Sequence, residues 1–159
     1  MRVYLLRHTS LKIAPNTFYG QSNIDVSENF MTEVSEIKNK IKKLKININN
    51  IERFSSPLKR CVKLANQIFK DFKEDDRLKE LYFGEWEMKC FDQIPKDELE
   101  NWQKNIMDFK IPQGESNTEF FNRLKSFCNE NILNNRNEVF IVAHAGSINC
   151  IISYLTGIS

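Results

Sequence analysis

The sequence predicts a single α/β domain in which a mostly parallel sheet lies between two layers of helices. Two short apolar runs, at residues 3–6 and 139–143, and an alternating stretch at 51–56 are predicted to be strands. Between them, apolar residues recur at steps of three and four, which predicts amphipathic helices. Strands that alternate with helices are typical of a three-layer α/β/α fold. A length of 159 residues suits one domain with its own core.

Composition and charge exclude several classes of function. The formal net charge of +2 is too small to indicate a nucleic-acid or membrane-surface partner. Neither a signal peptide nor an apolar run of spanning length is visible, so we expect a cytoplasmic protein. The cysteines are scattered without a CxxC pair, which predicts neither a zinc site nor disulfides. These cysteines are Cys61, Cys90, Cys128 and Cys150.

The first predicted strand is followed by two candidate functional residues. Four consecutive apolar residues at 3–6 indicate a strand that is buried on both faces. Arg7 and His8 follow it directly. Because ligands of open parallel sheets bind beyond the carboxyl ends of the strands, Arg7 and His8 are expected at the mouth of such a crevice.

The run at 139–143 repeats this pattern near the other end of the chain. It closes on His144, and the sequence contains only these two histidines. One such histidine alone is more often an ordinary strand-end residue. Two of them, with Arg7 beside one, predict an anion site with phosphate as the favoured ligand.

The segment 9–26 is predicted to be a long loop against the end of the first strand. It contains Pro15 and Gly20 and shows no helical periodicity. Loops of this length in compact domains are usually functional. The residues that could reach a ligand, or could equally serve only the turn, are Asn16, Tyr19, Gly20 and Gln21.

Helix signals follow at regular intervals. Ser27 is predicted to cap a helix that carries Phe30 and Leu44 on its apolar face, and Ser56-Pro57 to begin a second helix that ends near Phe69. Arg60 then lies near the amino end of that second helix, where backbone N–H groups favour an anion, unless it is only a surface arginine. Further helices are predicted over 94–107, from a capping box at residues 116–119 to about 133, and from about 148 onward.

The segment 77–87 combines carboxyl groups with aromatic residues around Gly84, which suits a loop that lines a pocket. A carboxyl group beside aromatic surface is partly desolvated, and it can then hold and donate a proton near neutrality. The alternative is a set of surface glutamates beside partly buried aromatic rings. The candidate carboxyl groups are Glu80, Glu85 and Glu87.

Four stretches together resemble the histidine phosphatase superfamily, the phosphoglycerate mutase-like proteins. Leu6-Arg7-His8-Thr9 is similar to its Arg-His signature, with threonine where many members have glycine, and Ser55-Ser56-Pro57-Leu58-Lys59-Arg60-Cys61 is similar to its Ser-Ser-Pro-Leu-x-Arg motif. Residues 78–87 resemble its acidic motif, and Ala143-His144-Ala145-Gly146 its second histidine. The motifs occur in the family's order and cover most of the chain.

The resemblance implies a reaction and a role for each site residue. His8 would attack phosphorus and become a phosphohistidine, while Arg7, Arg60 and His144 would hold the phosphate oxygens. Glu80, which the motif places before the glycine, would protonate the leaving group and then activate water; Glu85 and Glu87 are its rivals. No metal or cofactor is implied, and the partner is a small phosphate ester. The implied substrate contacts are Arg7, Asn16, Tyr19, Gly20, Gln21, Arg60, Tyr82 and His144.

A narrower resemblance is to the α-ribazole phosphatases of cobalamin biosynthesis. It rests on the Arg-His-Thr variant and on the stretches 19–22, 84–88 and 114–116. Two alternatives stay open: a phosphoglycerate mutase, disfavoured because the short span from Glu80 to His144 leaves room for few insertions, and a catalytically inactive module that binds phosphate esters or a protein.

The resemblance also bears on the domain. The sequence stops at Ser159, soon after the last predicted helix begins, whereas family members usually continue through at least another strand. We therefore expect residues 1–159 to form one histidine phosphatase domain without that strand. The sequence predicts no particular oligomeric state.

Overall fold

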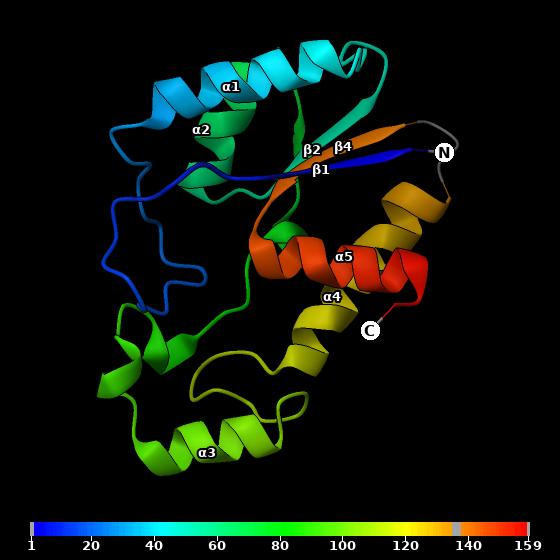
Figure 1. Cartoon of the computed structure of the whole chain (residues 1–159). Helices are drawn as coiled ribbons and strands as arrows, with labels where there is room; N and C mark the ends of the chain where they lie inside the picture. Colours follow the sequence, from blue (N-terminus) through cyan, green and yellow to red (C-terminus); the bar gives the residue numbers. More distant parts are fainter. Residues whose placement is uncertain (1, 135–137, 159) are drawn as a thin grey trace.

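The computed structural model describes residues 2–134 and 138–158 and contains one parallel sheet (Figure 1). Its four strands lie in the order β1–β4–β2–β3. Their bounds are Val3–Arg7 for β1, Glu52–Ser55 for β2, Lys73–Glu74 for β3 and Val139–Ala143 for β4. All three strand pairs are parallel, which confirms the predicted α/β fold class.

Helices cover both faces of this sheet. The helices α1 (Phe30–Lys43) and α2 (Lys59–Ile68) lie on one face, and α4 (Asn117–Cys128) and α5 (Ala145–Thr156) on the other (Figure 1). A π-helical turn, Asn129–Leu133, extends α4. The helix α3 (Lys96–Lys104) lies away from the sheet, after three short 3-10 helices at Asp76–Leu78, Gly84–Trp86 and Phe91–Gln93 (Figure 1).

The central strand β4 divides the core into two clusters, because successive side chains of a strand point to opposite faces. Val139, Ile141 and Ala143 pack in the cluster that includes residues of α4 and α5. Phe140 and Val142 pack in the cluster that includes residues of α1 and α2. All five residues of β4 are buried, which explains the unbroken apolar run that marked this strand in the sequence.

Two strands differ from the sequence-based expectation. The prediction that residues 3–6 are buried on both faces is wrong: they are half-buried, because β1 pairs only with β4 within the described part of the chain and forms an edge of the sheet. The strand β3 was not predicted. It has two residues, both exposed and charged, and it pairs with Phe54 and Ser55 of β2.

Helix starts were predicted too early where a serine has another partner. The helix α1 begins at Phe30; the Ser27 hydroxyl bonds to that of Ser10 at 2.6 Å and accepts from the Asn29 N–H at 3.3 Å. The helix α2 begins at Lys59 rather than at Pro57, and the Ser56 hydroxyl bonds to His144. By contrast, the capping box of α4 is confirmed, since the Ser116 hydroxyl accepts from the Glu119 N–H at 3.1 Å.

The remaining helices follow the predictions closely. The expected helix over 94–107 is shortened to Lys96–Lys104, and Ile106 lies beyond it with 45% of its surface exposed. The last helix begins at Ala145 and ends at Thr156, and the left-handed φ of 69° at Gly157 terminates it. Among the described residues, no helix combines the length and apolar character needed to cross a membrane.

Candidate active site

The site forms where three neighbouring strands end. The register pairs Arg7 of β1 with Ala143 of β4, and Ser55 of β2 with Val142 of β4. The residues that follow these strands therefore meet at one edge of the sheet, where ligands of such folds bind. The rings of His8 and His144 lie 5.3 Å apart, centroid to centroid. The predicted pairing of the two histidines is thus realised through the adjacency of β1 and β4.

His8 is buried in its neutral form with one ring nitrogen free. Its Nδ1 lies 2.7 Å from the carbonyl oxygen of Thr9. A carbonyl only accepts, so Nδ1 carries the hydrogen and Nε2 carries the lone pair. Burial lowers the pKa of His8 to about 4, and the positive charges of Arg60 and Arg7 add to this effect. At neutral pH the Nε2 of His8 is therefore an unprotonated nitrogen.

His144 is the opposite tautomer. The Arg60 Nε donates to its Nδ1 at 3.1 Å, and because a guanidinium only donates, Nδ1 carries the lone pair. The hydrogen is then on Nε2, which lies 2.8 Å from the Ser56 hydroxyl and donates to it. Complete burial, followed by the charge of Arg60, lowers the pKa of His144 far below its ordinary value. Both ring nitrogens are thus occupied within the protein.

Arg60 is a fully buried cation that holds the loop after β1. Its terminal nitrogens donate to the carbonyl oxygen of Ser22 at 2.7 Å and to that of Gly20 at 2.5 Å. Its guanidinium carbon also lies 5.3 Å from the centre of the Tyr19 ring. With Nε on His144, three of its five N–H groups have partners, and two remain for a ligand.

Arg7 and His8 line a pocket of about 340 Å³. Within the described part of the chain, the Arg7 guanidinium has no hydrogen-bond or ion-pair partner, and the Thr9 hydroxyl is buried without one. The pocket thus offers a nucleophilic nitrogen beside an uncommitted cation. Its lining residues are Arg7, His8, Thr9, Ser10, Leu11, Ile13 and Tyr19.

Glu80 lines a second pocket, of about 290 Å³. Its carboxylate accepts from the N–H of Leu81 at 3.0 Å and from that of Gly146 at 2.9 Å, in the first turn of α5. A Cβ at position 146 would meet the Glu80 carboxylate, so a side chain there would displace the carboxylate from this position. Tyr19 lines both pockets. The residues around the second pocket are Thr17, Phe18, Tyr19, Gly20, Glu80, Leu81, Phe83, Asn117, Phe120 and Gly146.

The two rival carboxyl groups lie elsewhere. Glu87 accepts from the backbone N–H groups of Gln21 at 2.8 Å, Ser22 at 2.8 Å and Phe83 at 3.1 Å, and from the Ser22 hydroxyl. It therefore ties the loop at 19–22 to the acidic segment. Glu85 is exposed. Neither residue lines the pockets around His8 and Glu80.

The predicted substrate contacts divide into three groups. Arg60 and His144 are fully buried and line neither pocket. Arg7, Tyr19 and Gly20 line the two pockets. Asn16, Gln21 and Tyr82 do not line them: Asn16 and Tyr82 are exposed, and the Gln21 amide donates to the Glu80 carbonyl at 3.0 Å. The aromatic composition of the acidic segment thus marked a real pocket wall through Phe83 rather than through Tyr82.

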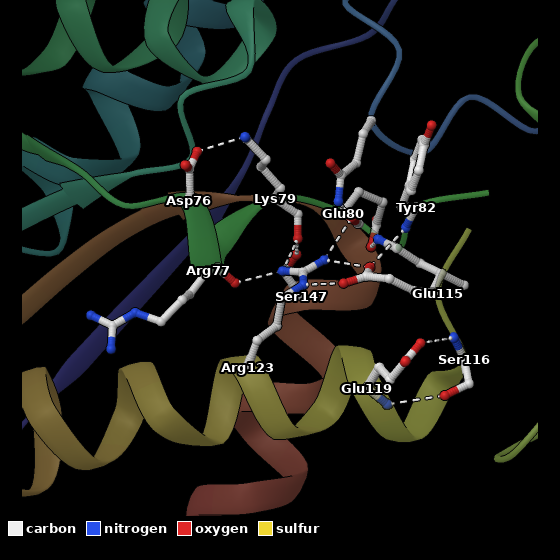
Figure 2. A network of polar contacts seen from close by, with 12 residues as sticks. Asp76, Arg77, Lys79, Glu80, Tyr82, Glu115, Ser116, Glu119, Arg123 and Ser147 are labelled. Carbon is white, nitrogen blue, oxygen red and sulfur yellow. Dashed lines mark hydrogen bonds and ion pairs between the residues drawn. The ribbon is translucent and has the colours of Figure 1, made fainter. Parts of the chain in front are cut away.

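Sequence reasoning missed several residues of the site. Asn117 and Phe120 line the Glu80 pocket from the start of α4, and Arg123 of the same helix binds the backbone of the Glu80 segment (Figure 2). One signal was available: Asn117 and Phe120 follow the capping serine Ser116 within the helix's first turn, and Arg123 lies about two turns after that serine. Among the described residues, no group of three or more potential ligands is placed to hold a metal ion.

Comparison with solved structures supports the fold. An α-ribazole phosphatase from Shigella flexneri matches with a TM-score of 0.85 and 21% identity, covering 100% of this chain and 81% of that one. A phosphoglycerate mutase from Thermus thermophilus matches with a TM-score of 0.77 and 18% identity, covering 96% of this chain and 82% of that one.

Comparison of the sequence with known proteins identifies the family of this chain. A protein of Hydrogenobacter thermophilus named "Putative phosphoserine phosphatase 2" is 30% identical over 165 residues, which is 99% of this chain and 79% of that protein. The family model described as histidine phosphatase superfamily, branch 1, matches residues 3–159. The chain therefore belongs to the histidine phosphatase superfamily.

Proposed function

We propose that this protein hydrolyses small phosphate monoesters through a phosphohistidine formed on His8. The observation that carries the proposal is the state of that side chain. Its Nδ1–H is fixed on the Thr9 carbonyl, its low pKa keeps the ring neutral, and its Nε2 has no partner in the described part of the chain. A neutral imidazole with a free Nε2 beside Arg7 is the nucleophile that phosphoryl transfer requires.

The reaction proceeds in two displacements. In the first, the Nε2 lone pair attacks phosphorus, the bond from phosphorus to the leaving oxygen breaks, and the Glu80 carboxyl group gives its proton to that oxygen. In the second, the Glu80 carboxylate takes a proton from water, the water oxygen attacks phosphorus, and the bond to Nε2 breaks. Phosphate leaves, and His8 and Glu80 return to their starting states.

Arginine side chains supply the positive charge for both steps. Arg7 and the two free N–H groups of Arg60 bind the phosphate oxygens, while His144 holds the Arg60 Nε at 3.1 Å. Direct contact between His144 and phosphate requires its Nε2–H to leave the Ser56 hydroxyl. Because guanidinium groups stabilise the transferring phosphoryl group, we propose that no metal is needed. Activity should survive excess EDTA, and loss on chelation with recovery in Mg²⁺ or Zn²⁺ would refute this point.

The pocket around Glu80 favours a bulky, uncharged leaving group. Its walls include Phe18, Tyr19, Phe83 and Phe120, and no lysine or arginine belongs to the described lining. Aromatic walls stack on flat apolar groups, whereas a carboxylate, as in phosphoserine or phosphoglycerate, would enter without a cation to pair with. We therefore place α-ribazole 5′-phosphate first among candidate substrates, since the Shigella flexneri neighbour is named an α-ribazole phosphatase.

Two measurements test the proposal. Acid-quench trapping with 32P-labelled ester should yield an acid-labile phosphoenzyme that maps to His8, and a binding module without catalysis would yield none. Turnover of α-ribazole 5′-phosphate, phosphoserine and 3-phosphoglycerate should then be compared with EDTA present. A preference for phosphoserine would overturn the substrate assignment alone, and return of the phosphoryl group to an acceptor rather than to water would indicate a mutase.

A further inference from the structure

We propose that Arg123 of α4, together with Glu115, is a positioning residue that holds Glu80 in place for proton transfer. The proposal rests on the proposed function, in which Glu80 is the acid. Neither residue lines the two pockets, so both would act through the backbone around Glu80 and not on the substrate. The network that they form is drawn in Figure 2.

Arg123 binds three carbonyl groups of the segment that carries Glu80. Its NH1 donates to the carbonyl oxygens of Arg77 at 2.7 Å and Lys79 at 2.8 Å, and its NH2 donates to the Glu80 carbonyl at 2.8 Å (Figure 2). No other side chain in the described part of the chain donates to so many carbonyls of one loop. The guanidinium thus fixes the path of the backbone immediately before the catalytic side chain.

Glu115 binds Arg123 from the other side, and we call this pair of residues the clamp. It accepts from the Arg123 Nε at 2.7 Å and NH2 at 3.0 Å, and from the Tyr82 N–H at 3.0 Å. All five N–H groups of Arg123 therefore have acceptors. The pair is largely shielded, with 19% of each side chain exposed, so its hydrogen bonds are only weakly screened by solvent.

The clamp meets the reacting groups at two points. Arg123 lies over the ring of Phe120, 4.7 Å from its centre, and Phe120 lines the pocket that contains the Glu80 carboxylate. The Ser147 hydroxyl of α5 donates to the Lys79 carbonyl at 3.0 Å, one residue from the Gly146 N–H that binds the Glu80 carboxylate (Figure 2). Backbone and carboxylate of Glu80 are thus anchored to α4 and α5 separately.

Lysine cannot replace this arginine. An ammonium group presents three donors from one point, whereas here five donors diverge toward a carboxylate and three carbonyls. Arg123→Lys keeps the charge but loses the geometry. A displacement of about 1 Å in a catalytic group can cost about 10²-fold in rate, so we expect a selective catalytic defect and not a general one.

The test compares two leaving groups in single-turnover formation of the phosphoenzyme. p-Nitrophenolate leaves without much protonation, whereas the alkoxide of ribose 5-phosphate needs the acid. Arg123→Lys should slow transfer from ribose 5-phosphate about 10- to 10²-fold more than transfer from p-nitrophenyl phosphate. Added to Glu80→Gln, which already lacks the acid, the same substitution should cost little more, since the two residues act as one unit.

The matched control is Arg53→Lys. Arg53 is similarly shielded, with 21% of its side chain exposed, and it pairs with Asp71 at 2.6 Å, but it does not touch the Glu80 segment. It should change both rates equally, if at all. Equal losses for the two substrates in Arg123→Lys would overturn the positioning role and leave the proposed function standing. Absence of any phosphoenzyme in the wild-type protein would instead overturn the proposed function.

A measurement that does not depend on turnover tests the positioning role separately from the proposed reaction. Amide hydrogen exchange of Leu81, Tyr82 and Gly146 should be faster in Arg123→Lys than in the wild type, because these N–H groups bind the Glu80 and Glu115 carboxylates. If Arg123→Lys does not fold, Glu115→Gln provides the second variant and should show the same selectivity and exchange pattern. Unchanged exchange at all three amides would refute the proposal.

Discussion

The two histidines follow the same pattern in the sequence but differ in tautomer and hydrogen-bond partners in the structure. Each ends a parallel strand, and the strands are neighbours. His8 carries its hydrogen on Nδ1, fixed to a carbonyl, and leaves Nε2 free in a pocket. His144 carries its hydrogen on Nε2 and has both nitrogens bound inside the protein. The first is arranged to react, and the second to hold Arg60.

The two arginines differ in the same way, in whether their side chains are free or bound within the protein. Arg7 lines the open pocket without a partner in the described part of the chain, whereas Arg60 is fully buried and bound to His144, Gly20 and Ser22. Arg7 is therefore open to a substrate, whereas Arg60 is held within the protein and has only its two remaining N–H groups for phosphate. Substitutions should separate the two arginines, since Arg7 affects catalysis alone and Arg60 affects catalysis and stability together.

The largest effect is expected from the nucleophile. His8→Ala should abolish both turnover and phosphoenzyme, because no other group can accept the phosphoryl group, while the protein remains folded. The measurement is acid-quench trapping with 32P-labelled ester, with circular dichroism to confirm the fold. Phosphate label on His144 in the wild-type peptide map would reverse the roles given to the two histidines.

The two arginines provide the next contrast. Arg7→Gln should lower the rate of phosphoenzyme formation by about 10² to 10³-fold, the usual effect of removing one donor to a transition-state oxygen, with little change in melting temperature. Arg60→Gln should lower the rate and also destabilise the fold by several kcal/mol, since each carbonyl left without a donor costs about 1–3 kcal/mol. Thermal unfolding of the two variants decides between these outcomes, and equal melting temperatures would contradict the division.

The sequence predicted most of the sheet and named the histidines and Arg60, which the structure brings together at one edge of that sheet. A buried strand is marked by an apolar run in the sequence, so β4 and the histidine that follows it could be predicted. The order of the family motifs identified Arg60 and Glu80. Prediction failed where a residue's partner is distant in sequence. Ser56 was expected to cap a helix; its hydroxyl accepts from the Leu58 N–H at 3.4 Å, but it also binds His144, 88 residues away. The role of Arg123 could not be predicted, because its carbonyl partners at 77–80 lie next to α4 only in the folded chain.

The edge strand shows the same limit. The apolar run at 3–6 cannot by itself distinguish a central strand from an edge strand, because burial depends on what lies beside it. β3 carries no signal at all, as its two exposed, charged residues pair with β2 through the backbone. Local sequence patterns therefore do not predict the order of the strands or the long-range hydrogen bonds of the site.

The supporting histidine should show a partial defect. His144→Gln replaces the rigid ring by a flexible amide that does not hold the Arg60 Nε and the Ser56 hydroxyl in the geometry of the ring, so phosphoenzyme formation should slow strongly while some trapping remains. Ser56→Ala, the matched control, removes the acceptor of the His144 Nε2 and of the Leu58 N–H but leaves the bond from Arg60 to His144, and it should have a much smaller effect. A complete loss of trapping in His144→Gln would mean that His144 takes part in the transfer itself.

The smallest effect expected is a dependence of stability on pH that both histidines share. Each ring is neutral in the folded protein, whereas in the unfolded chain it binds a proton below its ordinary pKa of about 6.5. The unfolded state therefore binds more protons as the pH falls, and the free energy of unfolding decreases. For His8, whose folded pKa is lowered to about 4, this loss runs from about pH 6.5 down to pH 4. At pH 5 the loss is about 2 kcal/mol for each histidine. Urea unfolding at pH 7.5 and pH 5.0 should thus show a loss about 2 kcal/mol smaller in His8→Ala than in the wild type, because the carboxyl groups contribute equally to both proteins. The same loss in both would mean that His8 is protonated in the folded protein at pH 5, which would remove the free lone pair that nucleophilic attack requires.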